Sequence, residues 1–193
     1  MPGWAIAVIA IVASFLVLAV LAAVAIPTFL NERARAAAPQ IPDRIGALTR
    51  SSDEAVTRDV ARIAANLGSG QRDKQGAAFV DASGSRHVFV ITAGFVTPVN
   101  DAFVVEFERG YWDGMRGQVP LGMELSSAVP RHAGRLGGRV TCAPLISPDG
   151  VTAGEVCLAV DANAWVSTID LSLAGQLDPT LIDTVREAVL PGR

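Results

Sequence analysis

The sequence predicts an α+β protein in which an N-terminal transmembrane helix precedes a two-layer domain of mostly antiparallel sheet with about three helices. Three observations lead to this class. The stretch 2–31 contains no charged residue. Segments of helical and of strand periodicity follow it in turn, and short turns rich in Gly and Ser join consecutive strands as hairpins. Hairpins make neighbouring strands antiparallel, and we expect the helices to cover one face of the sheet.

Residues 1–31 are expected to form a membrane anchor, with 4–30 in contact with the lipid bilayer. At ~1.5 Å per residue, a helix of this length crosses the ~30 Å hydrocarbon core. A cleaved signal peptide is the alternative, because Ala23-Val24-Ala25 has the spacing of a cleavage site. However, no basic region precedes the apolar run, which exceeds the usual ~7–15 residues. Residues 32–43 form a linker, and 44–193 form the domain.

Within the domain the elements are expected in the order α-β-β-α-β-β-β-α. Ser51 and Glu54 form a capping box at the start of the first helix. A second helix begins near Asp101. Asp178 caps the last helix, with Pro179 in its first turn. We expect strands at 77–81, 87–92, 139–146, 154–160 and 164–171, and a long loop at 114–130.

Cys142 and Cys157 are the only cysteines. A hairpin that turns at Ser147–Gly150 places them directly opposite each other, close enough for a disulfide. This bond would stabilise the fold by about 3 kcal/mol and would persist only outside the reducing cytosol. Buried free thiols and a metal site are the alternatives. The metal site is the weakest, because His87 and His132 do not lie at ligand spacing.

The side of the membrane on which the domain lies is indicated by two conflicting signals. Arg33 and Arg35 follow the apolar segment, and the positive-inside rule would place the domain in the cytoplasm. The cysteine pair favours the opposite side. We expect an extracytoplasmic domain, because a bias of two arginines is a weak topology signal.

Charge and motifs exclude several functions. The net charge is -3 and the arginines are scattered, which argues against nucleic acid as a partner. The chain has no Gly-x-Ser-x-Gly elbow, phosphate-binding loop or dinucleotide motif. His87 and His132 have no orienting partner at a suitable spacing. The sequence therefore predicts no catalytic residue, no cofactor and no metal ligand.

The second helix carries the one candidate interaction surface. Phe107, Tyr111 and Trp112 form it, since aromatic residues are enriched at interface cores. Packing in the domain core is the alternative for these three side chains. Glu106 and Arg109, three residues apart, are expected to form a solvated ion pair on the same helix.

Two resemblances add to these expectations. The stretch 21–27, followed by Phe29-Leu30-Asn31, resembles the end of the N-terminal helix of type IV pilins and pseudopilins, although no glutamate follows Gly3-Trp4. This resemblance implies a structural subunit of a pilus-like assembly.

The soluble part resembles a group of uncharacterised actinobacterial membrane-anchored proteins. The residues that carry this resemblance are Ile41-Pro42, the stretches 45–50 and 137–142, and Cys157 with Asp161; Ala159 stands where those proteins often have Trp. It implies an extracytoplasmic domain with a disulfide. The combined expectation is a membrane-anchored, non-enzymatic domain with a protein or envelope partner, and the alternative is a pilin-like subunit.

Overall fold

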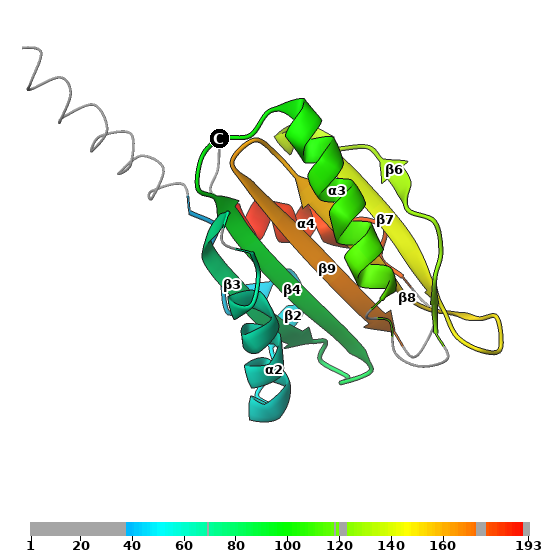
Figure 1. Cartoon of the computed structure of the whole chain (residues 1–193). Helices are drawn as coiled ribbons and strands as arrows, with labels where there is room; N and C mark the ends of the chain where they lie inside the picture. Colours follow the sequence, from blue (N-terminus) through cyan, green and yellow to red (C-terminus); the bar gives the residue numbers. More distant parts are fainter. Residues whose placement is uncertain (1–37, 69, 118, 120–122, 173–176, 191–193) are drawn as a thin grey trace, which may run out of the picture. The chain divides into compact units, whose positions relative to one another are not determined.

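The computed structural model describes residues 38–68, 70–117, 119, 123–172 and 177–190 (Figure 1). The predicted anchor, the pilin-like stretch and most of the linker lie outside these residues. In the part of the chain that is described, no helix combines the length and the apolar character needed to cross a membrane.

A nine-stranded sheet forms the framework of the domain. The strand order is β1-β2-β3-β4-β9-β8-β7-β5, β6 also pairs with β7, and every pairing is antiparallel. The strands are β1 (Arg44–Ile45), β2 (Leu48–Arg50), β3 (Gln71–Val80), β4 (Arg86–Phe95), β5 (Glu124–Leu125), β6 (Val129–Arg131), β7 (Arg139–Ile146), β8 (Thr152–Val160) and β9 (Ala164–Ser172).

The described helices are α2 (Glu54–Ala65), α3 (Asp101–Arg116) and α4 (Leu181–Val189), with a short 3₁₀ helix at Gly134–Leu136. The prediction of an α+β fold with about three helices and a mostly antiparallel sheet is confirmed. The predicted order of the main elements also holds, and the additional strands β1, β2, β5 and β6 are all short.

The prediction of two layers with the helices on one face is wrong, because helices cover both faces of the sheet. α3 and α4 lie on opposite sides of the sheet in Figure 1. Neighbouring residues of β8 show the same division. Cys157 belongs to the core cluster that contains Val185 of α4, whereas Leu158 belongs to the cluster that contains Trp112 of α3. Almost all of β8 is buried. Such a continuous apolar strand is typical of a sheet that is covered on both faces.

The N-cap of α2 lies two residues after the predicted one, Ser51. Asp53 is the N-cap, and its Oδ1 accepts hydrogen bonds from the backbone N–H groups of Ala55 and Val56, at 2.9 and 3.1 Å. Ser51 instead accepts a hydrogen bond from the Asp53 N–H. α2 lies very close to β3, since a Cβ added to Gly76 would be 2.6 Å from the carbonyl oxygen of Val60.

α3 extends further than predicted. Asn100 caps it by accepting a hydrogen bond from the Phe103 N–H at 2.9 Å. The helix passes through Gly114, where the loop was expected to start, and ends at Arg116. Packing of its buried side chains on the sheet outweighs the low helix propensity of glycine at this position. The remainder of the expected loop contains β5 and β6.

α4 is held by a buried arginine as well as by its apolar face. Arg186 is 1% exposed and donates hydrogen bonds to the carbonyl oxygens of Ala133 and Gly137. Asp178 lies just before the helix and accepts hydrogen bonds from the backbone N–H and the hydroxyl of Thr180. Asp178 was expected to cap α4, but the N-cap position is occupied by Thr180.

Candidate functional site

A groove lies between α2 and α3, on the face of the sheet where both helices pack. Its volume is about 590 Å³. Ile63 and Leu67 form the wall on the α2 side, and Phe107, Tyr111 and Met115 form much of the wall on α3. The floor is formed by β4 and β9, through Ile91, Trp165, Ser167 and Ile169. Figure 1 shows β4 and β9 passing between the two helices.

The groove lining is uncharged. None of the described residues that line it is Asp, Glu, Lys, Arg or His, although charged residues make up 18% of the chain. The polar lining consists of neutral amides and hydroxyls from Asn66, Gln71, Tyr111 and Ser167. A lining of this kind suits an uncharged ligand, because a charge moved there from water would find no partner.

Two glycines keep the α3 wall of the groove open. Gly110 and Gly114 are four residues apart, so that they lie on the same face of α3, and both line the groove. A Cβ at either position would meet no atom within 4 Å. Each glycine in a helix interior costs ~0.5–1 kcal/mol relative to alanine. No close packing requires these glycines, so they leave space in the groove at a cost to the stability of α3.

Tyr111 and Ser167 form a neutral polar pair at the groove floor. Their hydroxyl groups are hydrogen-bonded to each other, and either can be the donor. Burial raises the pKa of Tyr111 to about 12, and the hydrogen bond from Ser167 only partly offsets this effect. The residue as a whole is half-buried, because its ring faces the groove while its hydroxyl lies deep. Tyr111 therefore adds no charge to the site at neutral pH.

Two buried polar atoms at the groove have no partner. Trp165 is 2% exposed, and its Nε1 makes no hydrogen bond within the described residues. The same holds for the side-chain oxygen Oε1 of Gln71. Leaving such a group unpaired costs ~1–3 kcal/mol. Both atoms belong to residues that line the groove, so the described wall holds one unpaired buried donor and one unpaired buried acceptor.

The predicted interaction surface is divided between the groove and the core. Phe107 and Tyr111 are half-buried and line the groove. Trp112 is 5% exposed, and its Nε1 donates a hydrogen bond to the Thr141 hydroxyl at 3.1 Å. Trp112 therefore packs α3 onto the sheet and presents no surface to a partner.

Aromatic contacts link the α3 wall of the groove to the sheet. The ring of Phe107 lies 5.6 Å from that of Trp165 and 5.3 Å from that of Phe95, edge to face in the second case. Such pairs contribute ~0.5–1.5 kcal/mol beyond the area that they bury. These contacts tie Phe107 of α3 to Trp165 on the floor of the groove.

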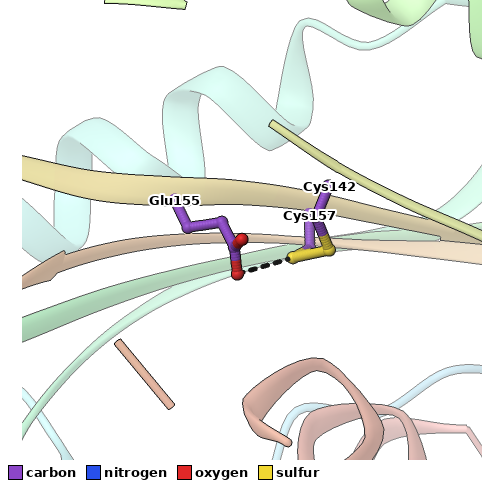
Figure 2. Close-up of side chains that lie close together, drawn as sticks. All are labelled: Cys142, Glu155 and Cys157. Atoms are coloured by element: carbon purple, nitrogen blue, oxygen red, sulfur yellow. Dashed lines mark hydrogen bonds between the residues drawn. A yellow bond between two sulfur atoms is a disulfide. The ribbon is translucent and has the colours of Figure 1, made fainter. Parts of the chain in front are cut away.

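The predicted disulfide is present on the opposite face of the sheet. Cys142 of β7 and Cys157 of β8 are bonded and directly paired, as the hairpin register predicted. Glu155 lies beside them, with Oε2 3.4 Å from the Cys157 sulfur (Figure 2). The three side chains lie close enough together to hold a metal ion, but sulfurs bonded to each other are not the thiolates that a metal binds.

Two partly buried ion pairs lie on this face of the sheet, one of which includes Glu155. Glu155 pairs with Arg131, and Asp170 accepts two hydrogen bonds from Arg86, at 2.9 and 2.6 Å. The pKa of Glu155 is raised, chiefly by burial and also by the neighbouring Asp170, while Arg131 acts against the rise. We favour the raised direction despite the ion pair, because Arg131 is itself partly exposed and is therefore screened.

The two histidines lie at separate, exposed positions. His87 is on β4, and His132 follows β6, where its Nδ1 accepts a hydrogen bond from the Gly134 N–H at 3.0 Å. Neither forms a hydrogen bond with a carboxylate in the described part of the chain. The expected exposed ion pair between Glu106 and Arg109 is confirmed, at 2.8 Å.

Of the residues that line the groove, the sequence reasoning identified only Phe107 and Tyr111 as candidate site residues. Gln71, Trp165 and Ser167 could not be found, because only the strand order brings them beside α3. Gly110 and Gly114 gave a signal: two glycines four residues apart in an aromatic helix. The expected loop at 114–130 placed Gly114 outside the helix, so the pair was not recognised.

The fold and the site together define a class, an α+β domain whose antiparallel sheet and two helices enclose an uncharged groove. No family model, curated protein or solved structure matches the chain.

Proposed function

We propose that the chain is a membrane-anchored, extracytoplasmic domain that binds a small molecule in the α2–α3 groove and does not transform it. The observation that carries this proposal is the groove itself, uncharged along its lining and kept open by Gly110 and Gly114. Ligand sites are typically concave and mostly apolar, with a few placed polar groups and a volume of ~300–1,000 Å³. The groove meets each of these conditions.

The anchor and the disulfide support the remaining parts of the proposal. The uncharged stretch 2–31 is long enough to cross a bilayer. The bond between Cys142 and Cys157 favours an oxidising compartment. The alternative of a pilin-like subunit rests on 21–31 alone, and these residues lie outside the described part of the chain.

Photolabelling with a small apolar diazirine tests the binding site. The full chain in lipid nanodiscs is irradiated with trifluoromethyl-phenyl-diazirine and digested with trypsin. Peptide 63–72 reports the α2 wall of the groove, and peptide 1–33 serves as a reference for probe dissolved in the bilayer. We expect peptide 63–72 to be labelled saturably in the wild type.

A groove-filling variant makes the test specific. Gly114→Leu places a side chain in the open space of the groove and improves helix propensity, so that the fold is retained. It should reduce the labelling of peptide 63–72 to background. The control, Ala102→Leu, lies on the same helix at an exposed position outside the groove lining and should leave the labelling unchanged. Equal labelling of Gly114→Leu and the wild type would show that the groove is not the binding site.

A further inference from the structure

The chemistry of the groove restricts its ligand further than the proposed function does, and the inference that follows rests on that function. A carboxylate or phosphate would enter a site with no cation among its described lining residues. An ammonium group would find no carboxylate there. Burying an unpaired ion costs several kcal/mol. The lining therefore selects against fatty acids, phospholipid head groups and amines.

The unpaired polar atoms specify what an uncharged ligand must offer. The Trp165 indole is a donor only, so that its Nε1–H requires an acceptor such as a carbonyl oxygen. The free Oε1 of Gln71 requires a donor such as a hydroxyl. A ligand with both groups would satisfy two buried atoms that the folded chain leaves unpaired, and the rest of its surface would meet apolar side chains.

We propose that the groove binds a neutral single-chain lipid ester, with its ester carbonyl on the Trp165 indole and a head-group hydroxyl on Gln71. Ile91, Phe107, Met115 and Ile169 would contact the acyl chain. A monoacylglycerol has this chemistry: one acyl chain, one ester carbonyl, free hydroxyls and no charge.

The bilayer is the source of this ligand. The predicted anchor confines the domain to a membrane surface, and the linker 32–43 spans at most ~40 Å when fully extended. Neutral lipids dissolve in the bilayer at high local concentration, whereas they are scarce in water. The groove is partly open to solvent, as entry of an acyl chain requires.

Three ligands with a twelve-carbon chain test separately the need for an ester carbonyl and the need for a neutral head group. Monododecanoylglycerol has the carbonyl, dodecylglycerol ether lacks only that carbonyl, and dodecanoate has a charged carboxylate in place of the glyceryl ester. Each competes, in nanodiscs holding the full chain, with a monoacylglycerol that carries a diazirine in its acyl chain. The readout is the mole fraction of competitor that halves labelling of peptide 63–72, with peptide 1–33 as the reference for partitioning.

We expect the ester to compete about fivefold more effectively than the ether, the value of one net hydrogen bond. Dodecanoate should compete at least about tenfold less effectively than the ester. In Trp165→Phe, the ester and the ether should become equal. Because this change leaves a cavity, a second variant carries benzothienylalanine at position 165, which replaces the indole N–H with sulfur and keeps the ring shape.

The outcomes separate the ligand class from the binding site. If the neutral probe labels the groove but ester and ether compete equally, or dodecanoate competes as well as the ester, the ligand class is wrong and the site stands. An ester preference that persists with benzothienylalanine also overturns the assignment to Trp165. If neither this probe nor the apolar diazirine labels peptide 63–72 in the wild type, the proposed function fails as well.

Discussion

The ionisation of Glu155, a buried carboxyl group, makes the stability of the fold depend on pH. Burial and the nearby Asp170 raise its pKa above 4.5, the ordinary value. A carboxyl whose pKa is raised by folding binds its proton more tightly in the folded state. Its contribution is therefore favourable while the group is protonated, and it is lost as the pH rises through and above 4.5.

The Glu155→Gln variant tests this sign. Glutamine does not titrate, so the wild type should lose more stability than the variant as the pH rises from about 4 to 7. Urea unfolding of the full chain, followed by near-ultraviolet circular dichroism at several pH values, measures the difference. Parallel pH profiles for the two proteins would contradict the raised pKa.

Asp149 provides a control of opposite sign. Its pKa is lowered, first by the hydrogen bond from the Ser147 hydroxyl. Its contribution is present above 3.8, the ordinary value, and is lost as the pH falls below it. The Asp149→Asn variant should therefore lose less stability than the wild type on acidification, the reverse of the pattern expected for Glu155.

At the scale of the element, the close approach of α2 to β3 determines one wall of the groove. A Cβ at Gly76 would lie 2.6 Å from the Val60 carbonyl oxygen, which is backbone and cannot rotate away. The Gly76→Ala variant must therefore displace the helix. We expect a loss of about 1–3 kcal/mol in the free energy of unfolding, measured by urea denaturation.

Gly70→Ala is the matched control for this prediction. Gly70 lies just before the same strand, and an added Cβ there meets nothing within 4 Å. It should change the free energy of unfolding by less than about 1 kcal/mol. Equal losses in the two variants would show that the helix–strand approach is not the cause.

Sequence periodicity predicted the helices α2 and α3. It did not predict which part of each apolar face is covered by the sheet and which part is left at the groove. The apolar stripe expected on α2 included Val60 and Ile63. Val60 is buried against β3, whereas Ile63 is 48% exposed at the groove. Periodicity identifies an apolar face from local spacing. Whether a neighbour covers all of that face depends on the position of α3, which is more than thirty residues away in the chain.

At the scale of the whole molecule, the contrast between local and distant pairing explains what the sequence could predict. The β7–β8 register followed from one short turn, and the observed pairing of Cys142 with Cys157 confirms it. By contrast, β4 pairs with β9 across a long separation, with Arg86 opposite Ser172. No local signal specifies that register, although it brings Trp165 beside α3 and so creates the groove.

The disulfide leads to a prediction about compartment and stability. On intact cells, a thiol reagent that does not cross membranes should label Cys142 and Cys157 only after reduction, and removing both cysteines should cost about 3 kcal/mol of unfolding free energy. A Cys157→Ser variant, which frees Cys142, is the positive control for access of the reagent after mild denaturation. Labelling without reduction would contradict the disulfide. An absence of labelling after reduction and mild denaturation, in the wild type and in Cys157→Ser alike, would contradict an extracytoplasmic domain.

The central claim, that the groove receives an uncharged ligand at a free indole donor, has a direct test in the indole N–H resonances of the full chain in nanodiscs. Trp165 has an unpaired Nε1, whereas Trp112 is already bonded to Thr141 and serves as an internal reference. Titration with monododecanoylglycerol should shift the Trp165 indole proton downfield and leave that of Trp112 in place, with the assignment made from Trp165→Phe. An unchanged Trp165 resonance at saturating ligand would contradict the account.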